Sequence, residues 1–140
     1  MNTHRGFSVL ELSVCLALSA IVGAASFVAI PALVRQHRLC GETRRLQLIF
    51  ERARARALMT GLPHSVALGK TQAILRAPNM AAVESLFLRH GVTLESASSS
   101  AQAVFFYPSH AASAATLLLR LGDLSSSIII SLRARTRSVC

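Results

Sequence analysis

The chain carries RGFSVLELSVCLALSAIVGAASFVAIPALV from Arg5 to Val34, and this long apolar stretch constrains what the rest of the protein can be. Residues 12–34 contain no formal charge. As an α-helix rising about 1.5 Å per residue they would be about 35 Å long, enough to cross hydrocarbon about 30 Å thick. A cleaved secretory signal and a plain single-pass anchor are both compatible with such a run. Neither explains Glu11, because an acid within a bilayer costs about 2.5–3.5 kcal/mol on insertion scales.

The helix is expected to continue beyond this stretch, because apolar residues then recur with helical spacing. Spacings of seven, four, three and four place them on one face of an α-helix, which can pack on a folded domain. Gly61-Leu62-Pro63 then supplies a helix stop. The sequence therefore predicts one helix from Phe7 to about Thr60. The apolar stripe consists of Leu39, Leu46, Phe50, Ala53 and Ala57.

Arginines line another face of this expected helix. The chain of 140 residues has a formal net charge of +9, and Lys70 is the only lysine among its 15 basic residues. Arginine forks onto phosphates and carboxylates, so this bias indicates an anionic partner. The face best fits a solvated surface near anionic lipid headgroups, and the alternative is contact with neighbouring subunits or nucleic acid. It contains Arg38, Arg45, Arg52 and Arg56, with Arg44 and Arg54 beside them.

From His64 onward, short apolar or alternating runs predict β-strands, separated by turn residues such as Gly69-Lys70 and Gly122-Asp123. A short helical turn is expected at residues 80–85. Apolar residues make up 52% of the chain and charged residues 15%, which excludes a disordered protein. The expected fold class is α+β, with a long N-terminal helix packed on a small antiparallel β-sheet. The runs are HSVAL, QAILR, GVTLES, AVFFYP, ATLLLRL and SIIISLRA.

The motif RGFSVLELSVCLAL resembles the class III signal of type IV pilins and pseudopilins. The resemblance implies that residues 1–6 are a cytoplasmic leader, which prepilin peptidase removes by cutting after Gly6. Phe7 would then become the N-methylated terminus of the mature protein. Cleavage at this point is expected to precede entry into a pilus or pseudopilus.

The resemblance also implies a division of the mature chain. Residues 7–34 are expected to form a transmembrane and assembly helix, which contacts inner-membrane lipid before assembly. Residues 35–60 are expected to be its amphipathic continuation, and residues 61–140 a β-rich periplasmic domain. The protein is then expected in the bacterial inner membrane as a single-pass protein, with its N-terminus cytoplasmic and its C-terminal domain periplasmic.

The resemblance gives Glu11 a role, since the family places an acid four residues beyond the new terminus. The freed amino group of Phe7 is a cation at the edge of an apolar helix. A carboxylate on a neighbouring subunit can pair with it as helices stack, so each charge gains a partner in a low-dielectric bundle. We therefore expect Glu11 to act in assembly, with other pilins or pseudopilins as partners.

The stretch FFYPSHAASAATLLLRLGDLSSSIIISLRARTR is similar to the end of the GspH/FimT branch of minor pilins and pseudopilins. In that branch a final strand runs into a Gly-Arg-x-Arg motif. Ala134 stands where the Gly is expected, Arg135 and Arg137 stand at the two arginines, and Arg133 is an additional one. If this segment is extended, residues two apart share a face at about 6.6–7 Å, close to the phosphate spacing along one DNA strand.

Arg133, Arg135 and Arg137 therefore form a candidate contact with double-stranded DNA, blind to sequence and sensitive to salt. In FimT-type minor pilins this tail motif is associated with DNA binding during uptake for transformation. The alternative is an exposed, solubilising strand edge. The same residues are compatible with both interpretations.

The remaining reactive residues allow a disulfide and indicate no catalysis. Cys40 and Cys140 would both lie in an oxidising periplasm, where a disulfide between them can form, whereas Cys15 lies in the expected anchor. The acids and histidines have neither metal-ligand spacing nor a catalytic arrangement. The protein is therefore expected to be no enzyme and to need no metal or cofactor.

These features together predict a minor pilin of a type IV pilus, similar to FimT, that assembles with other pilins and has a candidate DNA contact in its tail. The alternative is a minor, H-type pseudopilin of a type II secretion system. The net charge of +9 and the arginine-rich tail favour the pilus.

Overall fold

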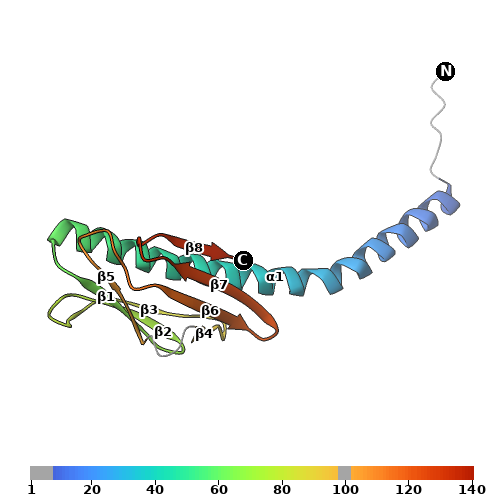
Figure 1. Ribbon diagram of the computed structural model, residues 1–140. Coiled ribbons are helices and arrows are strands. Elements are labelled where there is room, and N and C mark those ends of the chain that lie inside the picture. Colours follow the sequence, from blue (N-terminus) through green and yellow to red (C-terminus); the bar gives the residue numbers. More distant parts are fainter. Residues whose placement is uncertain (1–7, 98–101) are drawn as a thin grey trace, which may run out of the picture. The chain divides into compact units, whose positions relative to one another are not determined.

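The computed structural model describes residues 8–97 and 102–140, and within them all side chains except those of residues 25–29. In these residues one long α-helix is followed by eight β-strands (Figure 1). The chain divides into two compact units, Met1–Arg35 and Gln36–Cys140. The helix α1 spans Val9–Thr60, so its residues 9–35 belong to the first unit and its residues 36–60 to the second.

In the first unit, α1 exposes its apolar side chains. Those of Val9 and Leu10 are 84% and 73% exposed, and the described leucines, valines and isoleucines that follow are exposed as well. Among the described residues, no helix combines the length and the apolar character needed to cross a membrane. The expected span of residues 7–34 includes Phe7 and the side chains of residues 25–29, which lie outside the described part of the chain.

In the second unit, α1 buries the predicted apolar stripe. Leu46, Phe50, Ala53 and Ala57 are fully buried and Leu39 nearly so, which confirms the helical period read from the sequence. The helix ends as predicted. Gly61 has a φ of +68°, in the left-handed region that glycine adopts without strain, and its N–H donates to the Ala57 carbonyl.

The strands form two antiparallel sheets of four strands each, in the orders β3-β2-β1-β5 and β4-β6-β7-β8. The tightest hairpin joins β6 to β7, where Leu121 pairs with Leu124 across the predicted Gly122-Asp123 turn. The strands are β1 (His64–Leu68), β2 (Gln72–Arg76), β3 (Ala82–Phe87), β4 (Thr93–Ser96), β5 (Ala103–Phe106), β6 (Ala115–Leu121), β7 (Leu124–Ile130) and β8 (Thr136–Val139).

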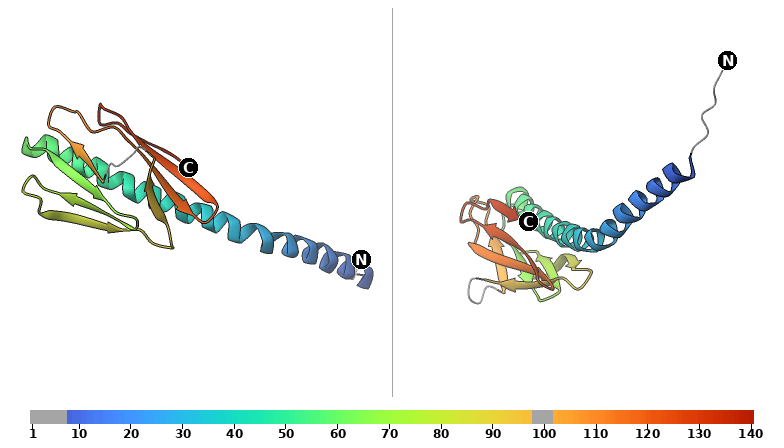
Figure 2. Two further views of the ribbon diagram at one scale, coloured as in Figure 1. Left: turned by 60° about the horizontal axis from the view of Figure 1, so that its bottom comes forward. Right: turned by 90° about the vertical axis from the view of Figure 1, so that its right-hand side faces the viewer.

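Both sheets pack against residues 36–60 of α1 (Figure 2). The rings of Phe50 in the helix and Phe106 in β5 have centroids 6.2 Å apart, which ties the first sheet to the helix. The hydroxyl oxygens of Thr43 in the helix and Ser126 in β7 are 3.0 Å apart and both residues are buried, which ties on the second sheet. The predicted α+β class, a helix packed on antiparallel sheet, is confirmed.

Two details of the prediction are wrong. The sequence predicts one small sheet, whereas the structure has two. The helical turn expected at residues 80–85 is also absent, because Ala82–Phe87 forms β3 and pairs with β2. Alanine, glutamate and leucine favour helix locally, but pairing with β2 overrides that preference.

Candidate functional site

The residues expected to act in processing and assembly lie at the start of the chain. Gly6 and Phe7 fall outside the described residues. Glu11 lies in the first turn of α1 and is exposed. The Ser8 N–H donates to the Glu11 carboxylate at 3.5 Å, and the Leu10 N–H donates to the Ser8 hydroxyl at 3.4 Å.

This arrangement is a capping box, with Ser8 at the N-cap and Glu11 three residues later. Each side chain satisfies a backbone N–H that the helix leaves without an internal partner. The interpretation of Glu11 from sequence did not include this role, although the pattern Ser-x-x-Glu was visible. Because the contact between the Ser8 N–H and the Glu11 carboxylate is long, the carboxylate keeps most of its capacity for another partner.

The predicted row of tail arginines, defined as Arg133, Arg135 and Arg137, is not one extended segment. Leu132 and Arg133 lie in the turn between β7 and β8, Arg135 precedes β8, and Arg137 lies within it. The prediction that residues 133–137 form one extended segment is therefore wrong at Arg133, which lies in the turn.

Backbone hydrogen bonds of Ser131 close the turn between β7 and β8. Its N–H donates to the Arg135 carbonyl at 3.0 Å, and its own carbonyl accepts from the Ala134 N–H at 2.9 Å. Ala134 is buried and has a φ of +52°, in the left-handed region where a side chain is strained and glycine is not. This left-handed conformation explains why the Gly-Arg-x-Arg motif has a glycine at the position that Ala134 occupies here.

The tail arginines are exposed cations. Within the described residues, no acid forms an ion pair with any of the three side chains. In β8, Arg137 stands opposite the exposed Ile129, whereas Thr136 stands opposite the buried Ile130. Arg135 and Arg137 alternate with residues that face the helix, so these two share the outward face.

The inward face of β8 is held on α1 by three links, which we call the tail clamp. The Thr136 hydroxyl donates to the Glu51 carboxylate, and the Ser138 hydroxyl donates to the Gln47 side-chain oxygen at 3.0 Å. The third link is the disulfide between Cys40 and Cys140, whose Cα atoms are 5.7 Å apart. The sequence suggested the two cysteines but not the other four residues, because nothing in it placed β8 along the helix.

The arginine face of the helix is partly occupied within the domain. Arg45 forms an ion pair with the buried Glu42 at 2.8 Å, and Arg52 pairs with Glu84 of β3. The Arg52 pair links the helix to β3, whereas the Arg45 pair lies within the helix. Arg44 and Arg56 are exposed and take part in no ion pair among the described residues.

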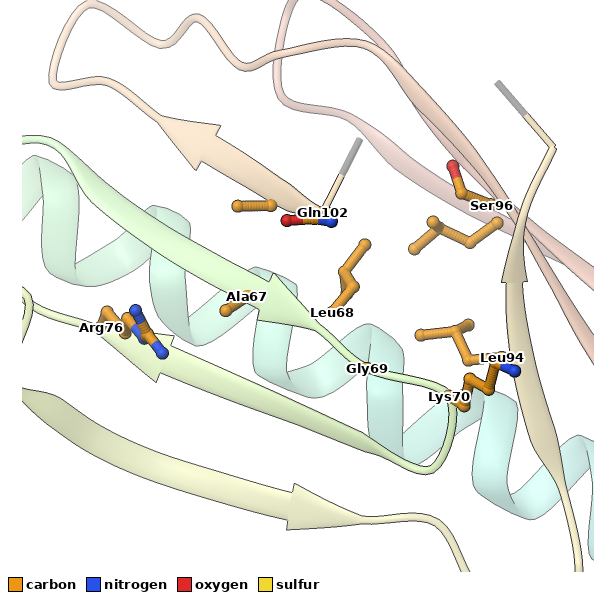
Figure 3. A pocket seen from close by; sticks show the side chains of 10 residues that line it. Ala67, Leu68, Gly69, Lys70, Arg76, Leu94, Ser96 and Gln102 are labelled. Atoms are coloured by element: carbon orange, nitrogen blue, oxygen red, sulfur yellow. The ribbon is translucent and has the colours of Figure 1, made fainter. Parts of the chain in front are cut away.

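A cavity of about 540 Å³ lies between the β1–β2 hairpin and β4 (Figure 3). Leu68 and Leu94 give it an apolar lining, and Figure 3 shows Lys70 and Arg76 toward opposite ends. None of its described lining residues is a His, Cys, Asp or Glu.

No protein-family model matches the sequence, and a search of curated proteins finds no significant match. Two crystal structures of the type IV minor pilin FimU from Pseudomonas aeruginosa strain PAO1 have a similar fold. One aligns with a TM-score of 0.63 at 13% identity, over 75% of this chain and 90% of that chain. The second crystal form gives a TM-score of 0.61 at 13% identity, over 73% and 93%. The protein thus has a pilin-like fold, in which a long N-terminal helix packs on antiparallel sheets.

Proposed function

We propose that the protein is a minor pilin, a non-enzymatic subunit that enters a type IV pilus by packing its N-terminal helix against other pilins. The observation that carries this proposal is a pilin-like fold with exposed apolar side chains along residues 9–35 of α1. A soluble monomer rarely leaves so much apolar surface in water. Inner-membrane lipid before assembly and neighbouring helices after it are the environments that such a surface needs.

Assembly begins, in this proposal, with removal of residues 1–6 by prepilin peptidase on the cytoplasmic side. The new amino group of Phe7 then pairs with the carboxylate of Glu11 from a neighbouring subunit. Two observations support this role for Glu11. The side chain is exposed, and among the described residues its contact is the long one with the Ser8 N–H. An acid with so weak a local partner can still pair with a cation.

The experiment that tests the proposal is recovery of the mature chain from filaments sheared off cells. The proposal expects a chain shortened by residues 1–6, present in the filament fraction with the other pilins. A Gly6→Leu variant should stay full-length and remain with the membranes. Two results would contradict the proposal: a wild-type chain that is recovered uncleaved, or a wild-type chain that is absent from the filament fraction. Copurification with secretion pseudopilins instead would assign the chain to a type II secretion system.

We also propose that the tail arginines bind double-stranded DNA through its phosphates. The specific support is three exposed guanidinium groups on one hairpin, without an acid partner among the described residues. Arg135 and Arg137 share a face and can contact neighbouring phosphates, while Arg133 reaches from the turn. Such contacts position a duplex but read no sequence.

Titration of the full chain in detergent with duplex DNA at several salt concentrations tests the second proposal. Each phosphate contact contributes about −0.9 to the slope of log affinity against log salt, so Arg135→Ala/Arg137→Ala should reduce the slope by about 2. The matched control is Arg52→Ala/Arg120→Ala, which removes the same charge from two arginines that already pair with acids. Equal losses in both double variants would show that net charge alone acts, and would defeat the proposal.

A further inference from the structure

The strand β8, which contains Arg137 and directly follows Arg135, has almost no hydrophobic attachment of its own. In β8, Val139 is the one apolar residue, and it is 53% exposed. Burial of apolar surface, which stabilises most strands, therefore contributes little here. Ladder bonds to β7, the hydrogen bond from the Ser126 hydroxyl to the Val139 carbonyl, and the tail clamp therefore hold β8 in place.

The tail clamp has a regular geometry. Cys40, Gln47 and Glu51 lie seven and four residues apart, so they share one face of α1. Their partners along and after β8 come in reverse order, with Cys140, Ser138 and Thr136 bound respectively. β8 therefore runs along the helix in the opposite direction, and the disulfide closes the far end of β8 onto the helix.

Closure of this end fixes the direction of the arginines. Arg135 and Arg137 alternate with Thr136 and Ser138, so the docking of the inward pair turns the outward pair to solvent. β8 is an edge strand, and edge strands fray when little buried surface holds them. Without the disulfide, β8 keeps the hydrogen bonds of Thr136 and Ser138 to the helix, one from the Ser126 hydroxyl to the Val139 carbonyl, and one edge of backbone pairing.

Solvent reaches the disulfide. A cavity of about 490 Å³ beside β8 is lined by both cysteines together with Gln47 and Ser138, and Cys140 is exposed. A small dithiol can therefore attack one of the sulfurs. Its thiolate forms a mixed disulfide and displaces one cysteine thiolate, and its second thiol then closes a ring and releases the other. Two electrons and two protons pass to the protein, which gains two thiols, and the dithiol becomes a disulfide.

We propose that the Cys40–Cys140 disulfide makes anion binding by the tail arginines redox-dependent. This inference rests on the proposed DNA-binding function and adds its regulation. In the oxidised protein the guanidinium groups are pre-arranged on a docked strand. In the reduced protein β8 detaches, and DNA must order the arginines as it binds, which weakens affinity by about tenfold without removing any charge.

The test compares oxidised and dithiothreitol-reduced full-length protein, in a Cys15→Ser background that removes the exposed free thiol. Reduction should raise the Kd for duplex DNA about tenfold and leave the salt slope unchanged, because the number of cations is the same. Hydrogen exchange at residues 136–139 should accelerate while the β6–β7 hairpin stays protected. Cys40→Ser/Cys140→Ser should match the reduced protein and should not respond to dithiothreitol.

Three outcomes would overturn the inference. Equal affinity for duplex DNA in both redox states would contradict the redox inference and leave the DNA-binding proposal unaffected. Loss of protection throughout β6 and β7 on reduction would make the disulfide a brace for the whole domain rather than a local clamp. Absence of binding at low salt in both states would remove the DNA proposal itself. A Thr136→Val/Ser138→Ala variant, with the disulfide intact, should fall between the oxidised and reduced proteins, and behaviour identical to wild type would count against the clamp.

Discussion

The two segments of α1 use the same helical backbone in opposite ways. In residues 9–35, the described large apolar side chains are exposed, from 84% at Val9 to 39% at Val34. In residues 36–60, the stripe that includes Leu46 and Phe50 is fully buried against the two sheets. The second segment finds its partner within the chain, whereas the first leaves its apolar surface exposed. Stability therefore resides in the second segment, and the proposed assembly role falls to the first.

The largest expected effect is on the free energy of unfolding. It comes from truncating a buried side chain in the second segment, compared with truncating an exposed side chain in the first. Phe50→Ala removes a fully buried ring that contacts Phe106, and should lower the free energy of unfolding by about 3–5 kcal/mol. Leu16→Ala, at a side chain 63% exposed, should leave that free energy unchanged. Urea unfolding of both variants in detergent, followed by circular dichroism, measures the difference. Similar losses in the two variants would mean that residues 9–35 also contribute to the folded domain.

The next effect concerns the disulfide, which joins residues 100 positions apart in sequence. Cys40→Ser/Cys140→Ser should lower the free energy of unfolding by about 2–4 kcal/mol, because the unfolded chain regains the freedom that the cross-link removes. Cys15→Ser, in the exposed segment, is the control and should change nothing. The same urea titration applies, and a double variant as stable as wild type would show that the cross-link adds no stability to the second unit.

The smallest effect concerns the arginine face of the second segment. Arg52 is 56% exposed and pairs with Glu84, and exposed ion pairs contribute about 0.2–1 kcal/mol, so Arg52→Ala should cost no more than that. Arg56→Ala, at an exposed arginine without an ion pair among the described residues, should cost less still. Thermal unfolding of the two variants ranks them. A larger loss for Arg56→Ala would assign that side chain an unrecognised contact in the domain.

Much of the fold could be predicted because its signals are local. Buried Leu46 and Phe50 follow the helical period, Gly61 ends the helix, and the Gly122-Asp123 turn closes the β6–β7 hairpin. Each of these depends on residues within a few positions of one another. Local patterns of this kind also predicted most of the strands.

The errors and omissions arise where distant residues decide. β3 forms from helix-favouring residues because β2 offers it a partner, and Glu84 within it then reaches Arg52. The tail turn depends on Ser131, whose bonds leave Ala134 left-handed. The links of the tail clamp other than the disulfide join residues more than eighty positions apart. No spacing rule in the sequence connects such residues, and only the packed structure brings them together.

The central claim is that residues 9–35 of α1 pack against other subunits, with Glu11 as the acid that pairs with their amino termini. The most direct measurement is the amount of mature chain in sheared filaments for wild type, Glu11→Gln and Ser8→Ala. Glutamine keeps the capping box and removes the charge, whereas Ser8→Ala keeps the charge and weakens the cap by about 0.5–2 kcal/mol. Loss of a paired charge within an apolar bundle is the larger defect, so Glu11→Gln should be depleted about tenfold or more and Ser8→Ala only slightly. Normal incorporation of Glu11→Gln, or depletion of Ser8→Ala alone, would contradict the account and would leave Glu11 as a helix cap.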